Sequence, residues 1–169
     1  KTPGVPATFK EAEQRFDDLQ KMGFQILYLA PIHPIGRTSR KGPNDSLQSS
    51  PNDPGSPWAI GNELGGHTAI DPALGTLEDF SHFVGEAKAH GLEIAMDLAL
   101  QCSPDHPWVK THPNWFYHRE DGTIKYAENP PYKYEDVYPL NFDGPDGKQL
   151  WEEIKNIVFF WAQHGVRIF

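Results

Sequence analysis

Hydrophobic positions repeat one arrangement three times along the chain: an amphipathic stretch, then a glycine, then a continuous apolar run. In the first copy, apolar residues recur at helical spacing and predict a helix that runs roughly from Thr8 to Lys21. Thr8 and Glu11 have the spacing of a capping box at its start. Gly23 ends this helix, and the apolar run over residues 24–30 predicts a buried strand.

The second and third copies predict two more pairs of helix and strand. The helices span about residues 77–90, with Thr76 as N-cap, and about residues 148–164. Each ends at a glycine, and residues 92–98 and 166–169 follow as strands. Near-continuous apolar strands that alternate with helices predict a parallel sheet with right-handed crossovers. We expect the three strands to be adjacent and parallel, with helices on one face only, as in an arc of a barrel.

The predicted fold class is α/β, in the form of a partial (β/α)8 TIM barrel with long loops or a subdomain inserted after the strands. Three parallel strands cannot close a barrel of eight. The chain also begins with a helix that should follow a strand and stops inside an apolar run, so we expect residues 1–169 to be a fragment of a catalytic barrel. Loop insertions are expected at about 31–75 and 99–147. Long loops on this side of a barrel carry the active site.

Composition narrows the classes of partner. The chain has 23 acidic and 15 basic residues and a formal charge of -8, which argues against a nucleic-acid partner. No apolar run approaches the ~20 residues of a membrane span. The chain opens on polar sequence without the apolar stretch of a signal peptide, and its single cysteine excludes an internal disulfide. These features together favour a cytoplasmic protein.

Polar residues at the end of the second predicted strand are the first candidates for chemistry. Asp97 either forms the floor of an active site or is a structural residue that accepts hydrogen bonds from a loop; the spacing leaves both open. Gln101 suits sugar hydroxyls or phosphate oxygens, because its amide both donates and accepts, but it also suits a loop surface. Cys102 is interpreted as a small buried residue rather than a nucleophile.

A basic cluster over residues 33–42 stands out in an acidic chain. Arg37, Arg40 and Lys41 lie beside two glycines, a composition that suits an anion such as phosphate. The cluster lacks the spacing of a P-loop, and its alternative is a solvated charged loop.

Aromatic residues crowd the two long loops, where they suit either carbohydrate faces or ordinary packing; they include Trp58, Trp108, Trp115, Phe116, Tyr117, Tyr126, Tyr132, Tyr134 and Tyr138. A hairpin is predicted over residues 115–126, because Asp121 and Gly122 form a strong turn signal. The eight histidines show no metal-ligand spacing, so no metal site is expected.

Two segments resemble the α-amylase type of glycoside hydrolases and transglycosidases. The run Gly65-Gly-His-Thr-Ala-Ile-Asp-Pro-Ala-Leu-Gly-Thr-Leu-Glu-Asp-Phe80 is similar to the segment that leads into the third barrel strand of that family. The run from Asp97 to Cys102 stands where the family has Asp-x-x-x-Asn-His, with Gln101 in place of Asn and Cys102 in place of His. His67 also replaces a tyrosine that stacks on substrate in many amylases. These differences argue against ordinary starch hydrolysis.

Longer motifs resemble one subfamily, the bacterial α-1,4-glucan:maltose-1-phosphate maltosyltransferases. The resemblance covers essentially all 169 residues, and its motifs are Pro31–Arg37, Arg40–Gly42, Asn52–Gly61, Ala99–Trp108 and Ile124–Pro131. It implies transfer of maltosyl from α-maltose 1-phosphate to the non-reducing end of an α-1,4-glucan, with release of phosphate. No cofactor is implied, and the parent protein is expected to be a homodimer.

Residue roles follow from the same resemblance. Lys41, Gln101 and Asp136 match positions that bind the donor, and Tyr134 matches an aromatic residue close to the sugar. The implied mechanism is a retaining double displacement through a glycosyl-aspartate. The nucleophile and the acid/base residue are expected beyond Phe169, so this chain alone should be inactive. The alternatives are an α-amylase-like hydrolase and a non-catalytic glucan-binding module.

Overall fold

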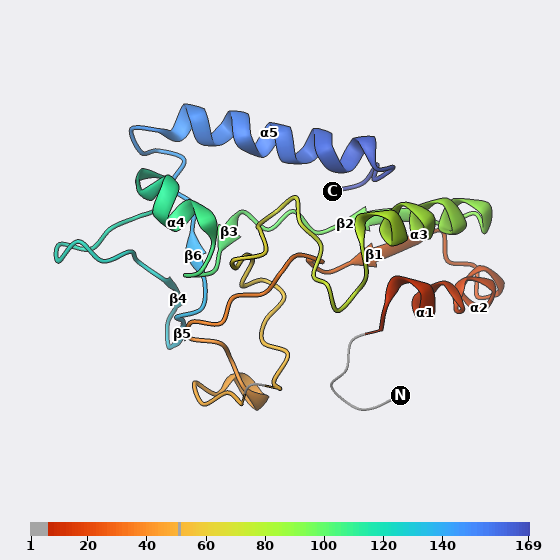
Figure 1. The fold of residues 1–169 in the computed structure, drawn as a ribbon, viewed down its shortest axis with the longest axis horizontal. Coiled ribbons are helices and arrows are strands. Elements are labelled where there is room, and N and C mark those ends of the chain that lie inside the picture. The colour runs from red at the N-terminus through yellow and green to blue at the C-terminus, as the bar shows by residue number, and fades with distance from the viewer. Residues whose placement is uncertain (1–6, 51) are drawn as a thin grey trace.

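A computed structural model describes residues 7–50 and 52–169 (Figure 1). The opening segment, on which the expectation about a signal peptide rests, lies outside the described residues. The helices are α1 (Phe9–Glu13), α2 (Phe16–Lys21), α3 (Leu77–Ala89), α4 (Pro107–Thr111) and α5 (Gly147–Gln163), with short 3-10 helices η1 (Pro43–Asp45) and η2 (Pro113–Trp115). The strands are β1 (Ile26–Leu29), β2 (Glu93–Met96), β3 (Gln101–Cys102), β4 (Ala127–Asn129), β5 (Tyr132–Tyr134) and β6 (Tyr138–Pro139).

The predicted parallel strands are confirmed. β1 pairs with β2 in parallel, with Ile26 opposite Glu93 at one end of the register. The third apolar run contributes a single parallel bridge, from Ile168 to Ala95 of β2. The strands are shorter than the predicted runs because their flanking residues lie outside the paired ladder.

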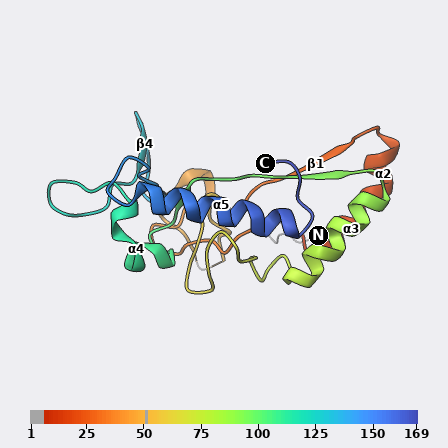
Figure 2. The same cartoon turned by 90° about the horizontal axis from the view of Figure 1, so that it is seen from above.

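Helices cover one face of this sheet, as predicted. Leu27 and Leu29 of β1 point into the same core as Ile94 of β2, which is 3% exposed. The alternate residues Ile26 and Tyr28 are 54% and 59% exposed. Figure 2 shows α3 and α5 on the same side of the β1–β2 pair. This one-sided arrangement, with side chains alternating between a covered face and an open face, is that of an arc of a barrel.

The first predicted helix is wrong in one respect: it is interrupted after Glu13, and α2 begins at Phe16. Phe9 and Phe16, seven residues apart, still share one partner, since their rings lie 5.3 and 5.1 Å from that of Phe83. The apolar face of the predicted helix is therefore kept across the interruption. The capping box at Thr8 is confirmed.

The other two helices follow the sequence closely. Thr76 caps α3 and exchanges hydrogen bonds with Asp79, which adds a second capping box. The C-caps of α3 and α5 are His90 and His164, and each is followed by a glycine with positive φ. A positive φ is the conformation that glycine adopts at least cost, which explains why a glycine follows each helix.

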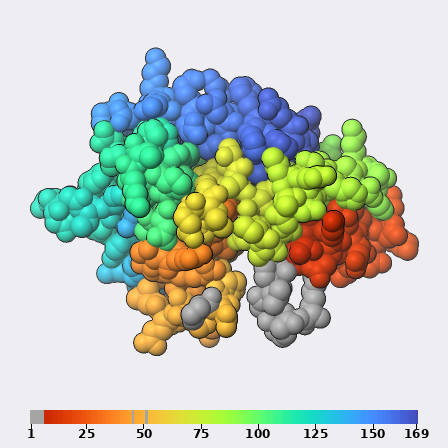
Figure 3. Space-filling view, viewed as in Figure 1, coloured from red at the N-terminus to blue at the C-terminus, as the bar shows by residue number. Residues whose placement is uncertain are grey.

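The long loops pack against one another beyond the ends of the parallel strands. β3 pairs with β6 and β4 pairs with β5, both antiparallel. The predicted hairpin is confirmed by an antiparallel bridge between His118 and Ile124. Figure 3 shows these orange, green and cyan segments gathered at one end of the molecule. Within the described residues, no helix is both long and apolar enough to cross a membrane.

Candidate functional site

A cavity of about 450 Å³ lies among the loops that follow β1 and β2. Three of the four residues predicted to bind substrate line it: Gln101, Tyr134 and Asp136. Trp58 and Asn129 also line the cavity. Residues from separate loops thus converge on one concave site that offers an amide, a phenol, a carboxylate and an indole, a mixture suited to a polar ligand with apolar faces.

Gln101 is held at the cavity by β3. Its side-chain Nε2 donates to the backbone oxygen of Trp58 at 3.2 Å. The neighbouring Cys102 points the other way and is fully buried, and burial raises the pKa of its thiol well above the ordinary range. A buried neutral thiol packs as a small apolar group, in keeping with the interpretation from sequence.

Lys41 lies beside the cavity rather than in its wall. Its side chain is 7% exposed, and its Nζ is 2.9 Å from Oε2 of Glu135. The hydrogen bond from Lys41 holds the pKa of Glu135 below its usual range. Because Glu135 stands between Tyr134 and Asp136 in the chain, this ion pair ties the basic loop to the segment that carries two of the cavity residues.

The basic cluster does not gather its three cations at one point. Arg37 forms an ion pair with Glu63 at 3.0 Å. Arg40 donates from Nε to the backbone oxygen of Asp53 at 2.9 Å and so holds its own loop together. Of the three cations, Lys41 alone reaches the segment behind the cavity, so the idea of a three-cation anion cradle is not supported by their placement.

Asp97 follows β2 directly, and its contacts match the structural alternative that the sequence left open, a carboxylate that accepts hydrogen bonds from a loop. Its backbone N–H donates to the oxygen of Leu29 at 3.0 Å, which extends the strand pairing by one residue. Its Oδ2 accepts hydrogen bonds from the hydroxyl of Tyr28 at 2.6 Å and from Nε1 of Trp58 at 2.9 Å. The hydrogen bond to Asp97 raises the pKa of Tyr28. The carboxylate therefore lies at the strand end and also holds a loop residue that borders the cavity.

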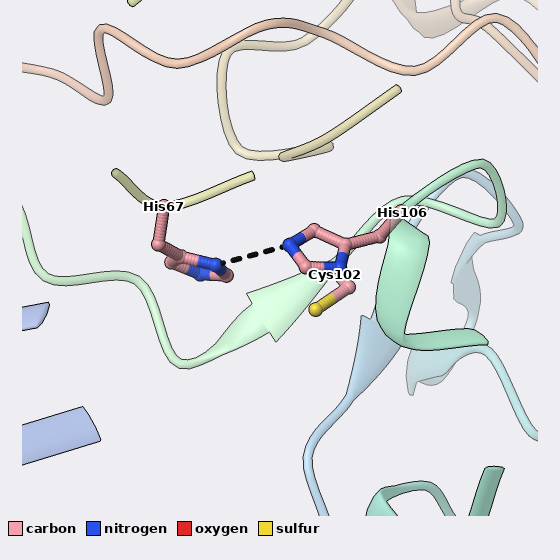
Figure 4. Close-up of side chains that lie close together, drawn as sticks. All are labelled: His67, Cys102 and His106. Carbon is pink, nitrogen blue, oxygen red and sulfur yellow. Dashed lines mark hydrogen bonds between the residues drawn. The ribbon is translucent and has the colours of Figure 1, made fainter. Parts of the chain in front are cut away.

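A buried cluster of His67, Cys102 and His106 lies next to β3 (Figure 4). One potential ligand atom from each residue falls within 4.8 Å of the others, a spacing compatible with a metal ion. The hydrogen bonds favour a different interpretation. Nδ1 of His106 accepts from the N–H of Trp108 at 3.1 Å, so its Nε2 carries the hydrogen and faces Nδ1 of His67 at 3.3 Å. Nε2 of His67 then donates to the oxygen of Ala99 at 3.0 Å.

This chain of hydrogen bonds requires both imidazoles to be neutral. Burial lowers the pKa of His67 and of His106 to about 3, and it lowers the pKa of His33, which packs against His67, to about 4. A metal ion bound to Nε2 of His106 would require that nitrogen to lose its hydrogen. The hydrogen would then be on Nδ1 of His106, where it would face the backbone N–H of Trp108. We therefore assign the cluster as a hydrogen-bonded chain rather than a metal site.

Two glycines make room for the ring of His106. A Cβ atom at Gly61 would lie 2.2 Å from its Cδ2, and a Cβ atom at Gly66 would lie 2.1 Å from its Nε2. Sequence reasoning missed this cluster, because His67 and His106 are 39 positions apart and share no motif spacing. It also missed the bond between Trp58 and Asp97, for the same reason.

Comparison with known proteins gives close relatives for this chain. No family model matches it. The α-1,4-glucan:maltose-1-phosphate maltosyltransferase of Methylacidiphilum infernorum is 56% identical over 99% of the chain, and that of Myxococcus xanthus is 58% identical over 96%. Maltosyltransferase 2 of Streptomyces coelicolor is 59% identical over 99%. The chain spans about a quarter of the length of each of these relatives. The resemblance inferred from the motifs is thus confirmed over nearly the whole chain.

Solved structures give the fold. An α-amylase from Lactobacillus plantarum matches 94% of the chain with a TM-score of 0.75 and 30% identity. A noncanonic maltogenic α-amylase from Thermotoga neapolitana matches 93% with a TM-score of 0.72 and 29% identity. The chain covers about a third of each of those structures. The predicted partial barrel of the α-amylase type is confirmed.

Proposed function

We propose that this chain is a segment of the catalytic barrel of an α-1,4-glucan:maltose-1-phosphate maltosyltransferase, and that the whole protein transfers maltosyl from α-maltose 1-phosphate to the non-reducing end of an α-1,4-glucan. One observation carries the proposal: relatives of that name are 56–59% identical over nearly the whole chain. The cavity supports it, because residues matched to donor-binding positions from separate loops line one space.

Within this proposal, each cavity residue has a role that its chemistry suits. The amide of Gln101 can donate to phosphate oxygens and can both donate to and accept from donor hydroxyls, whereas the carboxylate of Asp136 accepts from donor hydroxyls. Tyr134 packs against the sugar. Lys41 supplies positive charge beside the donor, and its ion pair with Glu135 at 2.9 Å fixes the position of that charge.

The reaction itself is completed by residues outside this chain. A retaining double displacement needs a carboxylate nucleophile and an acid/base residue. We assign both to the parent protein beyond Phe169. Asp97 is not assigned to either role, since its Oδ2 already accepts two hydrogen bonds from the framework.

We further propose a cytoplasmic, homodimeric parent protein that needs no cofactor. The single cysteine, which is buried and unpaired, suits a reducing compartment. The homodimer rests on family resemblance, and sedimentation of the parent protein tests it.

The experiment that tests the site compares variants of the parent enzyme by phosphate release from maltose 1-phosphate in the presence of glycogen. If Lys41 donates a charge-assisted hydrogen bond to the donor, Lys41→Ala removes that bond and should lower kcat/KM about ten- to a hundredfold. Gln101→Ala should lower it about two- to tenfold, because a neutral hydrogen bond is worth less. A folded Lys41→Ala enzyme with unchanged kcat/KM would remove Lys41 from the donor site.

The second candidate function is an α-amylase-like hydrolase, which the structural likeness to two α-amylases favours. The same assay separates the two. A hydrolase shortens glycogen without any need for maltose 1-phosphate, whereas a maltosyltransferase releases phosphate only when the donor is present.

A further inference from the structure

Trp58 is held to the protein framework at two points. Its indole Nε1 donates to Oδ2 of Asp97 at 2.9 Å, and its backbone oxygen accepts from Nε2 of Gln101 at 3.2 Å. The residue nevertheless remains 40% exposed and borders the cavity that Gln101 and Tyr134 line. A large aromatic side chain that is fixed by hydrogen bonds yet left open to a cavity is placed for contact with a ligand.

The carboxylate that holds Trp58 is itself rigidly placed. Asp97 continues the ladder of β2 through its bond to the oxygen of Leu29. The hydroxyl of Tyr28 donates to the same Oδ2 at 2.6 Å. Tyr28 lies opposite Ala95 in the strand register, and Asp97 is two residues beyond Ala95, so both side chains project from the same face of the sheet. The orientation of the Trp58 indole is therefore fixed by the parallel strands rather than by the loop that carries Trp58.

We propose that Trp58 is the sugar-stacking wall of the donor pocket and that Asp97 is a positioning residue that sets the angle of its indole. This inference rests on the proposed function, from which it takes the disaccharide donor. The N–H edge of the ring is engaged by Asp97, so the surface left to the cavity is apolar ring. Such a surface matches the C–H faces of a sugar, while the amide and carboxylate across the cavity match its hydroxyls.

The test uses four variants of the parent enzyme, assayed by phosphate release from maltose 1-phosphate with glycogen. Trp58→Ala removes the wall and should raise KM for the donor at least tenfold. Trp58→Phe keeps an aromatic ring but has no N–H to donate to Asp97. Asp97→Asn keeps the shape of the side chain but weakens its hydrogen bond with the Trp58 indole. Each of these two variants should raise KM for the donor about three- to tenfold with little change in kcat. Tyr28→Phe is the graded comparison: it removes the other hydrogen bond to the same Oδ2 but leaves the bond to Trp58, so it should raise KM less than Asp97→Asn does.

A double-mutant cycle separates positioning from a general structural effect. In the Trp58→Phe background no indole N–H remains for Asp97 to hold, so adding Asp97→Asn should raise KM no further. KM effects that multiply, or single variants with wild-type KM, would overturn the inference while leaving an active enzyme. If Asp97→Asn does not fold, a Trp58→Ala enzyme with wild-type KM overturns the inference by itself. A wild-type parent that releases no phosphate would overturn the proposed function and the inference together.

Discussion

Acid should destabilise this chain through its buried histidines, at a pH where its carboxylates are still ionised. The folded state keeps His67 and His106 neutral with a pKa of about 3, and His33 with a pKa of about 4, because burial disfavours their charged forms. An unfolded chain binds protons at these residues near the ordinary value of 6.5. Stability from the three histidines is therefore fully present above about pH 6.5 and is lost as the pH falls toward 4.

The size of the effect follows from linkage. Below pH 6.5 the unfolded state binds up to one more proton per histidine, which lowers the free energy of unfolding by up to about 1.4 kcal/mol per pH unit for each. Between pH 7 and pH 5 that is about 2 kcal/mol for one histidine and about 4–6 kcal/mol for the three. Since a domain of this size is typically stable by about 5–15 kcal/mol, the chain should be close to unfolding at pH 5.

Urea unfolding at pH 7, 6 and 5 measures this loss. His106→Gln should lower stability at pH 7 but reduce its dependence on pH by about 1 kcal/mol per pH unit, because one of the titrating groups is gone. His118→Gln, in the exposed hairpin, is the control for replacing a histidine outside the buried cluster. His82 works in the opposite sense, since its hydrogen bond with Glu13 raises its pKa and its contribution is lost as the pH rises. An equal slope in wild type and His106→Gln would refute the neutral histidine chain.

Three further outcomes are expected. Glu135→Gln should lower the free energy of unfolding by about 1–3 kcal/mol, measured in urea, because it removes the ion pair between Glu135 and the buried Lys41; stability equal to wild type would contradict this. Gly66→Ala should cost about 1–3 kcal/mol by forcing a Cβ into the ring of His106, whereas Gly85→Ala, on the open side of α3, should be neutral or stabilising by about 0.5–1 kcal/mol. The isolated chain, incubated with maltose 1-phosphate and glycogen, should release no phosphate above background, and turnover that survives purification would contradict the placement of the catalytic residues beyond Phe169.

The framework could be predicted from sequence because its signals are local. Apolar periodicity, the capping threonines Thr8 and Thr76, and the glycines after each helix act within a few residues of themselves. The interruption between α1 and α2 escaped prediction, because Phe9 and Phe16 keep helical spacing across it.

The candidate site was predictable only in part. Gln101 and Asp136 were located by resemblance, and the structure then placed both at one cavity. The cluster of His67 and His106 and the bond from Trp58 to Asp97 join residues about 40 positions apart through loops without regular spacing. Side-chain pairing of this kind depends on tertiary placement, which hydrophobic periodicity does not encode.

The most direct test of the central claim is the length distribution of glucan products formed by the parent enzyme from maltose 1-phosphate and a short maltooligosaccharide of defined length. Our account predicts products that grow only in steps of one disaccharide, with one phosphate released for each step. Free maltose in equal amount to phosphate without chain growth, or shortening of the oligosaccharide in the absence of donor, would contradict it.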